Sequence, residues 1–298
     1  MPDPAMRMAY LIMVHDDRAG LENLLRVLLP PDSIDFAVVH ADAGSTLWRE
    51  LRSGGGMLSV DPRVHLLADP VKVIWGHWSQ VEAARRLIEA ALAEGCDFAH
   101  TLSGADWPVV SRERLIADIA AEPAGTCFAE AVPGEQEDRM QDYRLDTRWL
   151  RLDPSRQRLA YAATWELRRA ARIAGRVGQA LGHERTRPLG RWSKGSCWWS
   201  LPPAALKTCS AALGQMVRSG RLKGTVCADE HVVPTALGAR HGQQLQPNRR
   251  FIDFAPGASS PRILTAADLP RIRASGAWFA RKVDAQVDPF FLALPQRA

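Results

Sequence analysis

The sequence predicts an α/β fold with a mainly parallel central sheet flanked by helices. Apolar runs of strand length recur in the first third of the chain, at 9–15, 34–42 and 64–69, and such runs are typical of buried strands. Residues 96–108 are expected to form a further strand followed by a loop. Segments with helical spacing separate the strands, and strands that alternate with helices favour a parallel sheet. A chain of 298 residues is long enough for one large domain with its own core. We therefore expect a single domain over 1–298.

Two of the separating segments carry a clear helical pattern. Residues 20–29 have helical spacing and stop at a pair of prolines. Residues 78–95 place their apolar side chains on one face. Ser79 suits the N-cap of this helix, Glu82 would complete a capping box, and Gly95 would end it.

A further helix is predicted at 164–182, where apolar and basic side chains separate. The apolar residues near one face are Trp165, Ile173, Val177 and Leu181, and the arginines on the remainder are Arg168, Arg169, Arg172 and Arg176. Such a helix is either a solvated surface element or a peripheral contact with an anionic membrane or ligand.

Three polar residues stand where the expected strands end. They are His15, Asp42 and Asp106. In open α/β sheets, ligands bind beyond the carboxyl ends of the strands. One polar residue at such an end is routine, but three in the first 110 residues indicate a binding site.

Composition and missing motifs exclude several classes of function. The net charge of +5 and the pI of about 9.2 fit an anionic ligand or surface. Five cysteines without a CxxC pair favour reduced thiols and a cytoplasmic setting. The first apolar run is too short for a signal peptide core or a membrane span. No GxGxxG, GxxxxGK[ST] or GxSxG occurs, so the usual dinucleotide, P-loop and hydrolase signatures are missing.

The stretch "GTVCADEHVVPTALG", at 224–238, holds two adjacent carboxylates in an otherwise apolar run. Asp229 and Glu230 are costly to bury unless they are paired or used. By themselves they indicate a helix start, with Asp229 as the cap and Glu230 in the first turn. Cys227 and His231 crowd beside them, but this spacing does not match a zinc site, and no metal is expected.

Several segments line up in order with one family. They are "YLIMVHDD", "VVHADAGS", "VIWGHWSQVEAARRLIEAAL", "FAHTLSGADWPV", "KGSCWWSLPPAAL", "ADEHVVPTAL" and "FARKVDAQVDP". The chain resembles the core-2/I-branching β-1,6-N-acetylglucosaminyltransferase family, which also contains the peptide O-xylosyltransferases. The combination of "LSGADWP", "GSCWWSL", "DEHVVPT" and "FARK" is specific, whereas 110–188 matches least.

The resemblance implies a GT-A-like fold and transfer of a sugar from a UDP-sugar, with inversion, to a glycan, glycolipid or glycoprotein acceptor. The family is metal-independent, and this chain has no D-x-D. The resemblance divides the chain into a nucleotide-binding half at 1–110, an acceptor side with the catalytic base at 111–248, and a diphosphate-binding segment at 249–298. GlcNAc, xylose or a related sugar would be transferred, at the inner face of a membrane or in the cytoplasm.

The resemblance also implies roles for single residues. Glu230 matches the family's catalytic base, and a glutamate is ordinarily ionised near neutral pH. Lys282 matches the diphosphate-binding lysine, with Arg281 beside it. Arg262 lies near a family arginine that has the same duty, although out of register.

The remaining candidates line the expected donor and acceptor sites. Met13, His15 and Asp42 fall at the uridine site, where an aspartate accepts hydrogen bonds from the nucleoside or else caps its own loop. Trp75, Asp106, Trp107 and Trp198 suit a sugar cleft, although Trp75 and Trp198 equally suit a core. Arg139 aligns with an acceptor-side arginine.

Two other classes of function compete with this interpretation. The first is a non-catalytic carbohydrate- or nucleotide-binding protein on the same scaffold, against which the joint presence of Glu230 and Lys282 argues. The second is a nucleic-acid-binding protein that uses the arginines at 168–194, but no recognised motif supports it. Nucleic acid is therefore not expected as a partner.

Overall fold

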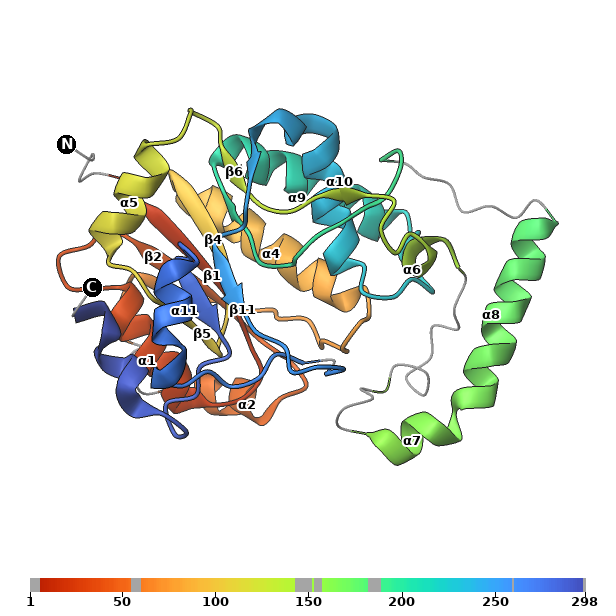
Figure 1. Ribbon diagram of the computed structural model, residues 1–298, viewed down its shortest axis with the longest axis horizontal. Coiled ribbons are helices and arrows are strands. Elements are labelled where there is room, and N and C mark those ends of the chain that lie inside the picture. Colours follow the sequence, from red (N-terminus) through yellow and green to blue (C-terminus); the bar gives the residue numbers. More distant parts are fainter. Residues whose placement is uncertain are drawn as a thin grey trace.

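Seven strands form the central sheet of the computed structural model, within the residues that the structure describes: 6–54, 60–142, 152, 157–181, 189–258 and 260–296 (Figure 1). The strand order is β10-β6-β9-β4-β1-β2-β3. Their bounds are β1 Met8–Val14, β2 Phe36–Ala41, β3 Val64–Leu66, β4 Phe98–Ser103, β6 Cys127–Phe128, β9 Ser200–Leu201 and β10 Leu245–Gln246.

Parallel pairing dominates this sheet. Strand β1 pairs in parallel with β2 and β4, β2 with β3, and β10 with β6, whereas β9 runs antiparallel to both of its neighbours. The predicted strands and the mainly parallel α/β class are therefore confirmed.

Alternate residues of β1 pack into two different cores, which is why the strand is apolar throughout. Tyr10 and Ile12 belong to one cluster of buried residues, together with the apolar side chains of α1 (Arg18–Leu28), α2 (Thr46–Arg52) and α5 (Arg112–Ala120). Ala9 and Leu11 belong to the other, together with those of α4 (Ser79–Glu94), α9 (Pro203–Arg218) and α10 (Asp229–His241). Successive side chains of a strand point to opposite faces, so helices cover both sides of the sheet.

Helix α4 confirms the predicted span at 78–95 but not its predicted capping box. The N-cap is Trp78, and no side chain caps the helix. The Ser79 hydroxyl instead accepts a hydrogen bond from the backbone N–H of Ile74, at 3.0 Å. Glu82, which is buried, instead pairs with Arg85 and Arg86. Gly95 ends the helix with a φ of 76°, as its sequence position predicts.

Two smaller sheets connect later segments of the chain to the central sheet and to α10. Strand β12 (Phe279–Arg281) pairs with β11 (Arg250–Ile252) and with β5 (Asp106–Pro108), so the C-terminal segment lies against the end of β4. Strand β7 (Val132–Pro133) pairs with β8 (Ser193–Lys194) beside α10. The short helices α6 (Asp138–Gln141) and α11 (Leu269–Ala274) accompany these strands.

Helices α7 (Arg158–Ala163) and α8 (Trp165–Ala180) stand apart from this body (Figure 1). The helix predicted at 164–182 is confirmed over α8, but no described residue of it is buried. Trp165 does not join the apolar face as predicted, because the Arg169 guanidinium lies 5.7 Å from its ring centroid, on the basic side. In the described parts of the chain, no helix is long and apolar enough to cross a membrane.

Candidate active site

The parallel register brings the carboxyl ends of β1, β2 and β4 to one edge of the sheet. Met13 lies opposite His40 of β2 and Ser103 of β4. The Asp42 N–H donates to the Val14 carbonyl across this edge, at 2.9 Å. The residues predicted at the strand ends are therefore neighbours.

Asp42 holds the loops at this edge together. Its Oδ1 accepts hydrogen bonds from the backbone N–H groups of Gly44 and Val73, at 2.8 and 3.0 Å. His15 is exposed, and its Nε2 lies 3.2 Å from Asp16 Oδ2. These contacts give Asp42 a loop-capping role, and its predicted contact with uridine stays a prediction.

Glu230 lies in the first turn of α10, with its side chain partly open to solvent. Its Oε2 lies 2.7 Å from Nη1 of Arg139 on α6, and about a third of each side chain is exposed (32% and 30%). The Arg139 carbonyl also accepts from the Val226 N–H, at 2.9 Å, which fixes α6 beside the start of α10. The structure thus joins two predicted site residues that are 91 positions apart.

Asp229 does not cap α10, in contrast to the expectation from its position. The N-cap is Ala228, and no side chain caps the helix. The Asp229 Oδ2 accepts from Nε2 of Gln80, at 3.3 Å, while its enclosed Oδ1 has no hydrogen-bond partner among the described residues. Burial, together with the neighbouring charge of Glu230, raises the pKa of Asp229 to about 7.

The loop that carries Trp75 is fastened to the same place. The Gly76 N–H donates to Oε1 of Gln80, at 2.6 Å, and the Gly76 carbonyl accepts from the Cys227 N–H, at 2.9 Å. Gln80 of α4 therefore connects this loop to Asp229. Trp75 is 48% exposed and is therefore not a core residue.

A second group of predicted residues meets where β5 pairs with β12. The buried Asp106 accepts from the N–H and the hydroxyl of Ser103, at 2.5 Å each. Its Oδ2 also lies 3.3 Å from Nη1 of Arg281. The Arg281 guanidinium stacks 4.1 Å from the ring centroid of Trp198. Asp106 Oδ1 and Arg281 Nε are enclosed without partners in the described part of the chain.

The loop that carries Cys197 joins the two groups. The Gly195 N–H donates to the Glu230 carbonyl, at 2.9 Å, and the Trp198 ring of the same loop stacks against Arg281. The start of α10 and the pair at β5 and β12 are therefore held by one loop. Burial raises the pKa of the Cys197 thiol.

The remaining cationic candidates have contacts of their own. The Lys282 ammonium donates to the Ser260 hydroxyl, at 2.7 Å. The Arg262 guanidinium pairs with Asp253, at 2.7 Å, and with Asp268. Two carboxylates thus share the charge of Arg262, and its predicted contact with a diphosphate stays a prediction.

Trp107 is the candidate that the structure separates from the others. Its ring is 4% exposed and belongs to the apolar core. Asp106 and Trp107 are successive residues of β5 and therefore point to opposite faces. Trp107 lines a cavity of about 550 Å³ between α1 and α5 instead of the site around Asp106.

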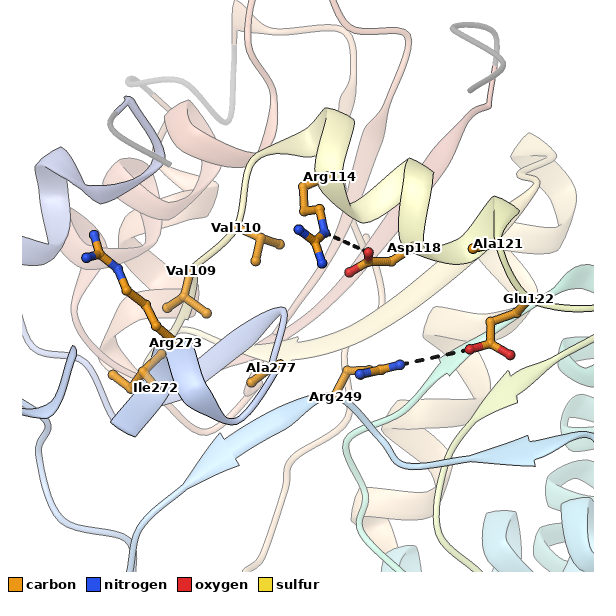
Figure 2. A pocket seen from close by; sticks show the side chains of 11 residues that line it. Val109, Val110, Arg114, Asp118, Ala121, Glu122, Arg249, Ile272, Arg273 and Ala277 are labelled. Carbon is orange, nitrogen blue, oxygen red and sulfur yellow. Dashed lines mark hydrogen bonds and ion pairs between the residues drawn. The ribbon is translucent and has the colours of Figure 1, made fainter. Parts of the chain in front are cut away.

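Another cavity, of about 330 Å³, lies against α5 and α11 (Figure 2). Arg249 and Glu122 face each other across it at 3.9 Å, and Arg114 pairs with Asp118 at its rim, at 2.7 Å. None of the predicted site residues lines this cavity. Among the residues described, no three His, Cys, Asp or Glu side chains gather as a metal site requires.

Sequence reasoning missed Gln80 and Cys197 as parts of the site. Both lie inside segments that carry the family resemblance, "VIWGHWSQVE" and "KGSCWWSL", but neither residue type signals this chemistry by itself. Their importance follows from contacts between distant segments.

Comparison with known proteins agrees with the resemblance seen in the sequence. The model of the family described as Core-2/I-Branching enzyme matches residues 8–273. A beta-1,3-galactosyl-O-glycosyl-glycoprotein beta-1,6-N-acetylglucosaminyltransferase of bovine herpesvirus 4 (strain LVR140) is 23% identical over 140 residues, and the enzyme numbered 3 of this name is 22% identical in Bos taurus and 21% in Homo sapiens. Each alignment covers 46% of this chain and 31% of the relative, so the match spans about a third of these proteins.

Two solved structures align with the chain at low similarity. A 4-diphosphocytidyl-2C-methyl-D-erythritol synthase is 12% identical, covering 76% of this chain and 91% of its own, with a TM-score of 0.35. A mannose-1-phosphate geranyltransferase from Thermus thermophilus is 14% identical, covering 82% and 69%, with a TM-score of 0.28.

Proposed function

We propose that this chain, which belongs to the Core-2/I-branching enzyme family, is a glycosyltransferase with a GT-A-like arrangement. It moves a sugar from a UDP-sugar to a hydroxyl of a glycan, glycolipid or glycoprotein acceptor. One observation carries the proposal: the Glu230 carboxylate is partly exposed, lies 2.7 Å from Arg139, and stands among the residues that the family resemblance selects. The names of the relatives favour GlcNAc as the sugar.

Glu230 is the base in this proposal. A carboxylate within hydrogen-bond reach of the acceptor hydroxyl takes its proton as the oxygen attacks C1 of the donor sugar. Glu230 lies in the first turn of α10, where the N–H groups of the helix start interact favourably with a carboxylate. Arg139 orients the Glu230 carboxylate through their ion pair.

The departing UDP requires positive charge nearby. Lys282 and Arg281 supply it in this proposal, without a metal ion. Two observations support that choice: the sequence has no D-x-D, and the described residues offer no cluster of three metal-ligating side chains. Lys282 is the residue that the family resemblance aligns with a diphosphate-binding lysine, so it is expected to make the main contact with the diphosphate.

Transfer proceeds with inversion, so an α-linked UDP-sugar gives a β-glycoside. Retention by double displacement would need a second carboxylate beneath C1 as the nucleophile. The Asp229 carboxyl is enclosed and held by Gln80, and Asp106 is buried and held by Ser103 and Arg281. In this proposal neither carboxylate serves as that nucleophile.

The substitution Glu230→Gln tests the base directly. The amide keeps the shape of the side chain but cannot accept the proton, so transfer should fall at least about 100-fold, while UDP binding stays within about threefold. Glu135→Gln, at another partly exposed glutamate, is the matched control and should keep full activity. Transfer above a tenth of wild type in Glu230→Gln would remove Glu230 from this role.

Nucleotide binding tests the proposed cations. Lys282→Ala should weaken UDP by at least about tenfold and uridine hardly at all, because only UDP carries the diphosphate. Equal losses for both ligands would place Lys282 elsewhere. Activity should persist in excess EDTA, and a loss that manganese restores would overturn the metal-free mechanism.

The alternative is a binding protein without catalysis on the same scaffold. A screen of UDP-GlcNAc, UDP-xylose, UDP-glucuronate, UDP-glucose and UDP-galactose separates the two functions. A transferase releases UDP from one donor, at a rate that Glu230→Gln abolishes. A binding protein holds the donor intact.

A further inference from the structure

Helix α8 has a continuous apolar face. Its apolar residues follow the three-and-four spacing of one helix face: Leu167, Ala170, Ile173, Ala174, Val177 and Leu181. In a helix of a globular protein, such a face is ordinarily the one that packs against the core. The spacing therefore predicts that something covers this face.

Nothing in the described part of the chain covers it. The exposed fractions are 54% for Leu167, 53% for Ile173, 53% for Val177 and 72% for Leu181. No described residue of α7 or α8 is buried, and the pair of helices stands off the body (Figure 1). A row of large apolar side chains that stays in water is a sign of an interaction surface.

The opposite face of α8 selects the kind of partner. It carries Arg168, Arg169, Arg172 and Arg176, whereas the helix has one acidic residue, Glu166. Two aromatic rings lie among these arginines: Arg168 stacks 4.2 Å from the ring centroid of Tyr161, and Arg169 lies 5.7 Å from that of Trp165. Basic side chains with amphipathic aromatic rings, opposite an apolar face, match the boundary between lipid head groups and acyl chains.

We propose that α8 is an interfacial helix that binds an anionic lipid surface in the plane of the bilayer. Leu167, Ile173 and Val177 enter the acyl boundary, and Arg169, Arg172 and Arg176 contact the anionic head groups. The helix is too short and too charged to span a bilayer. This inference goes beyond the proposed transferase function and does not depend on it.

Vesicle binding tests the proposal. At low salt, the full chain should bind vesicles of phosphatidylcholine with about 30 mol% phosphatidylglycerol, and it should bind pure phosphatidylcholine vesicles at least about tenfold more weakly. Replacing Arg169, Arg172 and Arg176 by Gln should weaken binding on the order of 100-fold, because each arginine near an anionic surface contributes about a factor of five. Raising the salt concentration should weaken wild-type binding as well.

A matched variant controls for net charge. Arg49, Arg218 and Arg240 are exposed arginines on other helices, and replacing all three by Gln changes the net charge by the same amount. This variant should bind the vesicles within about threefold of wild type. Losses that are equal for both triple variants would show attraction by overall charge alone and would overturn the assignment to α8.

A second variant tests the apolar face. Replacing Ile173 and Val177 by Asp should abolish vesicle retention, while circular dichroism and thermal unfolding stay close to wild type because both side chains are exposed. Vesicle binding that this change leaves at the wild-type level would overturn the proposal. A wild-type dimer that this variant dissociates, with no vesicle binding, would show instead that a second copy covers the face.

Discussion

Helices α4 and α8 are each 16 residues long and each has an apolar face, but the molecule treats them in opposite ways. Helix α4 buries Val81, Leu87 and Ile88 against α9 and the central sheet. No described residue of α8 is buried. The same sequence pattern therefore gives a core helix in one place and an uncovered helix in the other, and only the surroundings distinguish them.

The arginines of the two helices also differ in their surroundings. In α4, Arg85 pairs with Glu82 and Glu89, and Arg86 pairs with Glu82 and Asp69. These charges are balanced within the fold. Helix α8 carries four arginines and one acidic residue, Glu166, so its own sequence has an excess of positive charge. Helix α4 also reaches the candidate site through Gln80, whereas α8 supplies none of the residues grouped around Glu230.

The largest expected contrast is in stability. Leu87→Ala in α4 should lower the free energy of unfolding by about 2–5 kcal/mol, because it leaves a cavity in a fully buried cluster. Val177→Ala in α8 should change it by less than about 0.5 kcal/mol, because the side chain is already exposed. Urea denaturation of both variants measures the difference. Equal losses would show that α8 packs against the body in solution.

The next prediction concerns how stability depends on pH through Asp229, which Gln80 of α4 contacts. The pKa of Asp229 is about 7 in the fold because of burial and the charge of Glu230, whereas its ordinary value is 3.8. Between these values the folded state holds a proton that the unfolded state has lost. Stability should therefore fall as pH rises from about 4 to 7, and the cost is fully present above about pH 7.

Asp229→Asn tests this dependence. The variant should be more stable than wild type at about pH 8, by up to about 4 kcal/mol, and nearly equal to it at about pH 4. Denaturation curves at a series of pH values, with Glu166→Gln in α8 as the control, measure the difference. A wild-type stability that rises over this range because of Asp229 would contradict the assignment.

The smallest contrast concerns charge pairing on the two helices. Glu82→Gln removes the ion pairs of a buried carboxylate with Arg85 and Arg86 and should cost about 2 kcal/mol. Glu166→Gln in α8 should cost less than about 0.3 kcal/mol. Thermal unfolding at low and high salt measures both, and the Glu82 effect should shrink as salt rises. A larger loss at Glu166 would show that α8 depends on charge pairing within the fold.

The sequence predicted the strands and the spans of α4 and α8, because periodicity is a local property. It did not predict how α4 begins: Ile74 and the two arginines engage Ser79 and Glu82, and these contacts depend on the folded structure. The sequence analysis also placed Trp107 and Trp165 on the wrong faces. The pleat of β5 turns Trp107 toward the core, and the helical turn of α8 places Trp165 on the basic side.

In the candidate site, too, single residues could be predicted from the sequence, but contacts between distant segments could not. Family resemblance selected Glu230 and Arg139 separately, but their ion pair joins segments 91 residues apart. Gln80 belongs to the site through its contact with Asp229, and Cys197 through the loop that also carries Gly195 and Trp198, and no local pattern indicates either. Asp42 and Arg262 were identified by position, and the structure adds that each is held by groups of its own region.

The stereochemistry of the product tests the central claim most directly, because a single base at Glu230 without a protein nucleophile requires inversion. The decisive measurement is the proton NMR coupling between H1 and H2 of the newly transferred sugar, with a gluco-configured α-linked donor such as UDP-GlcNAc. The account predicts a large coupling, which identifies a β-glycoside. A small coupling, which identifies an α-glycoside, would contradict the role of Glu230 as the base of an inverting transfer.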